Sequence, residues 1–225
     1  MKYIMGKKQR ILFIGLLDGG GAEKVLSSIL QHFDYNKYEV NVLSSIDKLP
    51  KCNEVPDEVI KKIIFNGNFF IRVINILRHY KLFKLSDAIY RHFILRGIGN
   101  AKFDTIVSFT EGPNAKIHSL IMDKGKRHVS WVHCDFVKFP WSHKYFNNDA
   151  DERKFYSSVD EVVFVSKDAL NSWKSIYGSS KKETVLYNLV DREKICEMAD
   201  NKVDIEKYRF TICSVGRLIS VKRID

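Results

Sequence analysis

Short apolar runs alternate with longer segments of helical spacing along most of the chain. The runs are rich in β-branched residues and apolar at consecutive positions, which predicts strands buried on both faces of a sheet. The predicted strands cover residues 10–17, 39–45, 59–65, 103–109, 127–133, 161–165, 184–187 and 210–215. The predicted helices cover residues 22–33, 69–95, 114–122, 149–156 and 167–177. This alternation predicts an α/β fold with a doubly wound, Rossmann-like parallel sheet.

The pattern changes after Asp191. A polar, charged stretch is followed by a further apolar run at 208–215, which ends in the turn Gly216-Arg217-Leu218. Because a lone strand has nothing on which to bury its faces, this run either joins the first sheet or opens a second α/β unit. We expect residues 1–191 to form one domain, and residues 192–225 to form a linker and the start of an incomplete second domain.

Length and composition narrow the class of protein. The chain has 225 residues, of which 45% are hydrophobic and 28% charged, so it is a globular chain and neither disordered nor collagen-like. Its formal net charge of +10 favours an anionic partner such as phosphate, nucleic acid or an acidic membrane surface. The four cysteines are widely spaced, which predicts reduced thiols and neither a disulfide framework nor a zinc site.

Neither a signal peptide nor a transmembrane helix is predicted. The apolar run at 11–17 leads into a glycine turn instead of a small-residue cleavage site, so we interpret it as a buried strand. No apolar stretch approaches the roughly 20 residues that a transmembrane helix requires. We therefore expect a cytoplasmic chain whose contact with a membrane, if any, is peripheral.

Three consecutive glycines, Gly19 to Gly21, connect the first predicted strand to the first predicted helix. Glycines at such a turn let the backbone approach a ligand and aim the helix amides at it. The dinucleotide fingerprint fails because Lys24 stands at its third glycine, and the P-loop fails because Val25 replaces Ser or Thr. The segment is therefore either a tight turn or a ligand loop of another kind.

Three segments together resemble family-4 glycosyltransferases of the GT-B fold. They are Gly20-Gly21-Ala22-Glu23-Lys24, Val185-Leu186-Tyr187-Asn188-Leu189-Val190-Asp191 and Cys213-Ser214-Val215-Gly216-Arg217-Leu218-Ile219-Ser220-Val221-Lys222-Arg223. The chain departs from the family pattern at Leu189, where Gly or Pro is common, and at Arg223, which replaces a glycine.

The resemblance implies a role for several residues. Gly216, Arg217 and Lys222 would bind the diphosphate of a nucleotide-sugar donor, since two converging cations stabilise the leaving nucleoside diphosphate. Gly20, Gly21, Glu23, Glu111 and Asn188 would contact acceptor or sugar. His133 would act at the transferred sugar. The family's second domain, with its paired glutamates, is not present before Asp225. No cofactor or metal is expected.

The residues themselves support a site at the ends of the strands. His133 follows a predicted strand, where open α/β sheets bind ligands, although a histidine at a strand end can also be structural. Asp135 either orients the imidazole or faces water. Glu111 follows another strand, and Asn114 either meets the acceptor with it or, as we expect, caps the next helix. Ser166 ends a third strand in the same way, in a role that the residues alone leave open.

The segment 69–102 is basic and rich in bulky apolar residues. Seven Lys and Arg residues stand there against one acid, Asp87. An amphipathic helix of this composition binds anionic bilayers. A helix that packs its apolar stripe on the sheet and leaves the basic face in water shows the same pattern.

The function that we expect is a retaining glycosyltransferase. It would transfer a sugar from a nucleotide-diphosphate sugar to a saccharide acceptor, lipid-linked, in bacterial cell-surface polysaccharide synthesis of the capsule or O-antigen type. The alternatives are a basic α/β module that binds nucleic acid without catalysis, and an inactive half of a glycosyltransferase. Nucleic acid is the less favoured partner.

Overall fold

One parallel sheet organises the protein. A computed structural model describes residues 7–17, 20–46, 55–65, 67–179, 181–201, 210 and 212–214. Its strands lie in the order β3-β2-β1-β4-β5-β6-β7, and every pair is parallel. The strands are β1 (Gln9–Ile14), β2 (Tyr38–Ile46), β3 (Ile60–Phe65), β4 (Phe103–Ser108), β5 (Gly125–Val132), β6 (Glu161–Phe164) and β7 (Glu183–Val185). The predicted fold class is confirmed.

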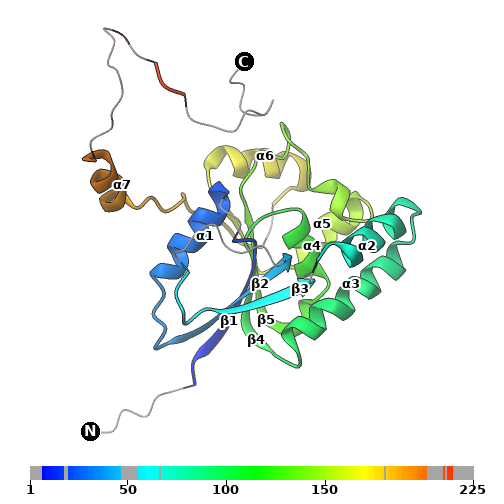
Figure 1. Cartoon of the computed structure of the whole chain (residues 1–225). Coiled ribbons are helices and arrows are strands. Elements are labelled where there is room, and N and C mark those ends of the chain that lie inside the picture. The colour runs from blue at the N-terminus through cyan, green and yellow to red at the C-terminus, as the bar shows by residue number, and fades with distance from the viewer. Residues whose placement is uncertain are drawn as a thin grey trace. The chain divides into compact units, whose positions relative to one another are not determined.

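Helices cover both faces of this sheet (Figure 1). They are α1 (Gly21–Gln31), α2 (Phe69–His79), α3 (Phe83–Ile98), α4 (Pro113–Ser119), α5 (Asp149–Ser158) and α6 (Lys167–Tyr177). Leu12 and Ile14 of β1 pack in one core with residues of α2, α3 and α4, whereas Phe13 packs in another core with α1. The strands are apolar at consecutive positions because both of their faces are buried.

The single helix predicted over 69–95 is wrong. The segment forms the two helices α2 and α3, which are separated by Tyr80, Lys81 and Leu82. Lys81 has φ +58°, and the backbone N–H groups of Leu82 and Lys81 donate to the carbonyls of Leu77 and Arg78. These bonds form a Schellman motif, which usually contains glycine at the position of Lys81. Because the segment contains neither glycine nor proline at this point, the break could not be predicted from the sequence.

The chain divides into two compact units, residues 1–190 and 191–225. The first contains the whole sheet. In the second, the described residues form α7 (Arg192–Ala199), whose N-terminal turn is capped by the Asp191 side chain, an acceptor for the Lys194 N–H. Of the strand predicted at 210–215, the described residues Phe210 and 212–214 are not strand. In the described part of the chain, no helix is long and apolar enough to cross a bilayer.

Candidate functional site

The strand order reverses between β1 and β4. From β1 the sheet continues through β2 and β3 on one side, and through β4 to β7 on the other. In open α/β sheets, ligands bind at such a reversal, outside the carboxyl ends of the strands. A cavity of about 230 Å³ lies there, lined from the end of β1 by Gly15 and Leu16, and from the end of β4 by Phe109, Thr110 and Glu111. We call it the His133 cavity.

His133 lines this cavity directly after β5, as the sequence predicted. Its ring packs against the aromatic rings of Phe109 and Trp131, at centroid distances of 5.0 and 6.4 Å. Burial lowers the pKa of His133, and the nearby Glu111, the Phe109 carbonyl and Glu23 oppose that shift only in part. The imidazole is therefore neutral at pH 7. Its Nε2 atom is buried and has no hydrogen-bond partner in the part of the chain that the structure describes, so it can bond a ligand hydroxyl.

Glu111 joins two segments that are distant in sequence. Its carboxylate is only 3% exposed, and Oε2 accepts from the His133 backbone N–H at 2.9 Å. Oε1 accepts from the indole Nε1 of Trp141 at 3.0 Å. Since each oxygen is held by a protein donor, the geometry fits a brace for His133 and Trp141. The predicted contact of Glu111 with an acceptor stays a prediction.

The loop after Glu111 is shaped by Trp141. Gly112 has φ +72°, and a Cβ atom there would lie 2.7 Å from the Trp141 ring. Only glycine meets both conditions. The helix α4 begins at Pro113, whose fixed φ suits the first helical position. The prediction that Asn114 caps this helix is wrong, because Asn114 lies inside it and donates to the Thr110 hydroxyl at 2.7 Å.

A buried chain of hydrogen bonds anchors α4 to the sheet beneath the cavity. The Ser108 hydroxyl contacts the Ser130 hydroxyl at 3.0 Å, and His118 Nδ1 lies 3.0 Å from the Ser108 oxygen. At the other side of the ring, His118 Nε2 lies 3.0 Å from His128 Nδ1. Burial lowers the pKa of His118 well below its usual value, and burial also lowers that of His128. Both rings are therefore neutral, as a shared proton between two imidazole nitrogens requires.

The predicted glycine loop lies at the same edge. Gly20 is the N-cap of α1, and the Glu23 carboxylate folds back over it, so a Cβ atom at position 20 would lie 2.2 Å from Glu23 Oε2. Glu23 lines the His133 cavity, whereas Gly21 has open space around it. Asn188 is exposed after β7 and does not line this cavity. The predicted donor residues Gly216, Arg217 and Lys222 lie outside the described residues.

Two polar residues near the site have local structural roles. Asp135 neither orients the imidazole nor stands free in water: its Oδ1 accepts from the Ser172 hydroxyl and from the N–H groups of Val137 and Lys138. The Ser172 bond, followed by the Lys138 N–H, lowers the pKa of Asp135 to about 2. Ser166 caps α6, since its hydroxyl accepts from the Ala169 N–H.

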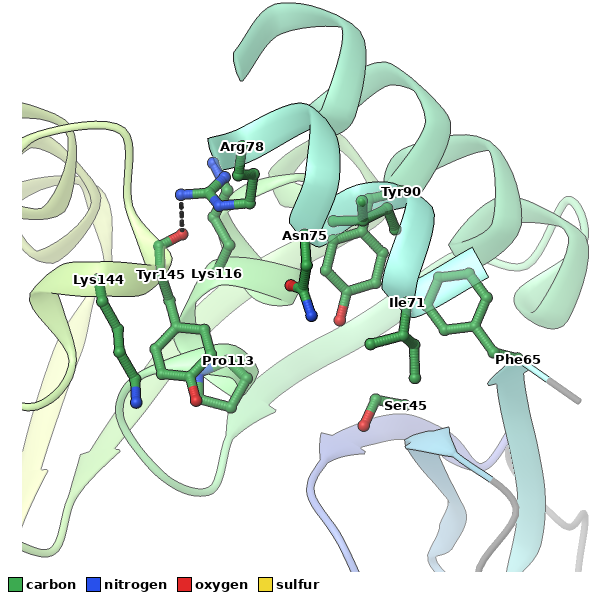
Figure 2. Close-up of a pocket in the computed structure, with 11 residues that line it drawn as sticks. Ser45, Phe65, Ile71, Asn75, Arg78, Tyr90, Pro113, Lys116, Lys144 and Tyr145 are labelled. Atoms are coloured by element: carbon green, nitrogen blue, oxygen red, sulfur yellow. Dashed lines mark hydrogen bonds between the residues drawn. The ribbon is translucent and has the colours of Figure 1, made fainter. Parts of the chain in front are cut away.

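A second cavity, of about 450 Å³, lies beneath α2 and is missing from the sequence predictions (Figure 2). Arg78, Lys116 and Lys144 line it, so we call it the Arg78 cavity. The Arg78 guanidinium donates to the carbonyls of Tyr145 and Phe146, each at 2.8 Å. Burial lowers its pKa, although Asp87 opposes the shift. The basic composition of 69–102 was visible in the sequence, but an inward-facing arginine was not.

The sequence also missed Trp141, which carried no signal beyond its place after Pro140. Among the described residues, no group of three His, Cys, Asp or Glu side chains could hold a metal ion. The Cys134 thiol lies next to His133, but burial raises its pKa. A protonated thiol is a poor nucleophile. Among the described residues that line this cavity, His133 Nε2 is therefore the buried side-chain atom that lacks a hydrogen-bond partner.

The chain resembles known proteins in its sequence family and in its fold. The family model described as Glycosyltransferase Family 4 matches residues 19–194, well over half of the chain. No curated protein matches the chain in sequence.

Solved structures resemble the chain in fold. A crystal structure of Anabaena HepE, in complex with UDP and glucose, matches 81% of this chain with a TM-score of 0.52 and 14% identity. Phytolacca americana UGT2, complexed with UDP-2fluoro-glucose and pterostilbene, matches 88% of it with a TM-score of 0.48 and 9% identity. The chain spans 45% and 58% of those two chains, about half of their length. The HepE match supports the Rossmann-like fold.

Proposed function

The chain belongs to glycosyltransferase family 4, and on this premise we propose that it transfers a sugar from a nucleotide-diphosphate sugar to a saccharide acceptor. One observation carries the proposal: His133, whose buried Nε2 has no hydrogen-bond partner among the described residues, lines a cavity at the strand-order reversal. A neutral imidazole there exchanges hydrogen bonds with a sugar hydroxyl without adding charge. We further propose that transfer retains the anomeric configuration.

The donor diphosphate is assigned to Arg217 and Lys222, with Gly216 next to Arg217 in the sequence. An Arg and a Lys that converge on the diphosphate stabilise the negative charge that grows on the leaving nucleoside diphosphate. Glu23 and the glycines Gly20 and Gly21 are assigned to the sugar and acceptor, since Glu23 lines the His133 cavity. Glu111 is assigned the role of holding His133 in place through its backbone N–H.

Calorimetric titration with a panel of nucleotide-diphosphate sugars tests the donor assignment. We expect at least one of them to bind the full chain, and Arg217→Ala to weaken it by about tenfold or more, because a charge-assisted pair is lost. Arg223→Ala is the matched control, because this arginine stands in the same segment at a position where the family has glycine. Absence of donor binding by the parent chain would contradict the proposal.

Transfer itself is tested with a radiolabelled donor sugar and membrane lipid extract as the source of acceptor. We expect His133→Ala to reduce label transfer by at least about tenfold, since one hydrogen bond to the reacting sugar is lost. Label in a lipid-soluble product would support the lipid-linked acceptor of cell-surface polysaccharide synthesis. The anomeric proton coupling of the product would reveal retention or inversion. Equal transfer by parent and variant would remove His133 from the site.

The tip of the α2–α3 hairpin supports peripheral binding to a membrane. Tyr80 is 70% exposed, and Ile76, Leu82 and Leu85 are at least half exposed. Lys81 and Lys84 are exposed beside them, whereas Arg78 and Arg91 are engaged with Asp87 and Asp123. Apolar side chains flanked by free cations suit an anionic bilayer surface.

Sedimentation with vesicles tests this surface. We expect the chain to bind phosphatidylcholine vesicles that contain phosphatidylglycerol more strongly than vesicles of phosphatidylcholine alone. Leu82→Glu should reduce the bound fraction severalfold, because a charge replaces an inserted apolar side chain. Leu186→Glu is the matched control, since Leu186 is also 50% exposed but lies far from the hairpin in sequence. Equal loss in both variants would contradict a specific docking surface.

A further inference from the structure

We propose that the Arg78 cavity binds a phosphate group, which, given the proposed function, belongs to the acceptor. The cavity is formed at the carboxyl ends of β2 and β3, by Ser45 and Phe65, and is covered by α2. Pro113 lines both this cavity and the His133 cavity. The two cavities are therefore neighbours along one edge of the sheet, so one acceptor can occupy both.

The charge of the lining favours an anion. Arg78, Lys116 and Lys144 are three cations, and among the described lining residues there is no carboxylate. Asp87 does not line the cavity but forms ion pairs with two of its cations, at 2.7 Å from Lys116 and 3.4 Å from Arg78. One carboxylate for two buried cations leaves excess positive charge, which a low-dielectric site makes unfavourable until an anion binds.

Hydrogen-bond donors in the cavity remain unused. Lys116 is 5% exposed, and its ammonium has three N–H donors, of which only the one to Asp87 has an acceptor among the described residues. The Tyr90 hydroxyl makes no hydrogen bond within the described part of the chain. Figure 2 shows this hydroxyl and the Asn75 amide pointing into the same space. These donors face one space, so an acceptor-rich ligand completes this site.

Arg78 has a different role. Its guanidinium is bound to Tyr145, Phe146, Asn147 and Asp87, so it supplies a fixed positive charge rather than free donors. A phosphate monoester, with about −1.5 to −2 charge and three acceptor oxygens, matches that field and the donors of Lys116, Lys144 and Tyr90. The apolar side of the cavity, formed by Phe65, Ile71 and Ile74, suits a hydrocarbon next to the phosphate.

Calorimetric titration at constant ionic strength tests the site with three probes: octyl phosphate, inorganic phosphate and the uncharged octyl glucoside. We expect octyl phosphate to bind the full chain and octyl glucoside to bind much more weakly. Tighter binding of octyl phosphate than of inorganic phosphate indicates an apolar-tailed acceptor. Equal binding indicates a site for free phosphate. No binding of either phosphate overturns the proposal.

Three variants assign the binding to this cavity. Lys116→Met should weaken phosphate binding by about tenfold, and Lys144→Gln and Tyr90→Phe by a few-fold, since each removes one donor to a charged ligand. Lys144 is exposed and Tyr90→Phe keeps the ring, so these two variants carry the test if Lys116→Met does not fold. Lys154→Gln is the matched control, because Lys154 is an exposed lysine outside the cavity. An equal effect of Lys154→Gln overturns the assignment.

The titration uses no donor sugar, so its outcome is independent of sugar transfer. His133→Ala should leave phosphate binding unchanged. Intact phosphate binding without donor binding or transfer would reject the proposed function alone. Transfer that depends on His133, without phosphate binding, would reject the phosphate site alone.

Discussion

The two cavities at the carboxyl edge of the sheet differ in size and in charge. The His133 cavity, of about 230 Å³, contains the carboxylates of Glu111 and Glu23. The Arg78 cavity, of about 450 Å³, contains three cations. Both lie at the ends of parallel strands and share Pro113. The difference therefore arises from the segments around each strand end: the carboxylates come from α1 and the loop after β4, whereas the three cations come from α2, from α4 and from the turn at 143–145.

Replacing Asp87 should have the largest effect, because it removes the negative charge that Arg78 and Lys116 share. We expect Asp87→Asn to lower the free energy of unfolding by about 3 kcal/mol, as for a buried ion pair that loses one partner. Urea denaturation measures this. Asp123→Asn is the control, because its pair with Arg91 is exposed and should be worth less than about 1 kcal/mol. Similar losses in both variants would contradict a buried charge cluster.

Replacing Glu111, which holds His133 and Trp141, should give the next largest effect. In Glu111→Gln, an amide NH₂ faces one of two N–H donors, so we expect a loss of about 2 kcal/mol in unfolding free energy. The Trp141 fluorescence should also change, since its indole loses its acceptor. Glu58→Gln, at an exposed glutamate, should leave both readouts unchanged. An unaltered Glu111→Gln protein would show that the carboxylate is not a brace.

Acid should destabilise the folded protein, because its buried imidazoles are neutral. The folded pKa values of His118 and His133 lie below their usual value of 6.5, so below pH 6.5 the unfolded chain binds more protons. Stability is complete above that pH and falls with decreasing pH, by up to about 1.4 kcal/mol per unit for each histidine. Urea denaturation between pH 7.5 and 5.5 measures the slope.

Substitution of His118 isolates its share of this slope. His118→Gln should be less stable at pH 7.5 but should show a shallower loss on acidification, whereas His92→Gln, at an exposed histidine, should match the parent slope. An unchanged slope in His118→Gln would mean that another group takes up the proton.

The smallest effect is expected at Tyr90, whose hydroxyl makes no hydrogen bond in the described part of the chain. Tyr90→Phe should change the free energy of unfolding by less than about 0.5 kcal/mol, because no bond is lost. Tyr35→Phe should cost about 1 kcal/mol, since the Tyr35 hydroxyl donates to the Leu30 carbonyl at 2.5 Å. If both variants lose the same stability, the Tyr90 hydroxyl has a partner in the folded protein and is not free for a ligand.

Sequence reasoning predicted the framework of the fold well. Seven of the predicted strands are present to within a few residues, because their apolar runs follow from burial on both faces. It failed where backbone conformation departed from residue preference. Lys81 adopts a left-handed conformation without glycine, so one predicted helix is two. Asn114 had the residue type of a cap, but Pro113 begins the helix one residue earlier than predicted.

For the site, the sequence could identify residues at strand ends but not their partners. His133 and Glu111 were found because each follows an apolar run. That the Glu111 carboxylate binds the His133 backbone and the Trp141 indole depends on contacts 22 and 30 residues apart. Arg78 likewise resembled its basic neighbours, yet it is bound to backbone carbonyls 67 and 68 residues away.

The sequence by itself therefore determined the parallel α/β sheet, the strand ends that line the two cavities at one edge of it, and the excess of positive charge. These properties depend on local pattern, on the common direction of the strands and on composition. Only the tertiary structure decided which charges are buried and paired, and that two neighbouring cavities of opposite character share this edge. The reason is physical: burial and hydrogen bonding depend on which distant segments come into contact, and a local sequence pattern does not show which segments these are.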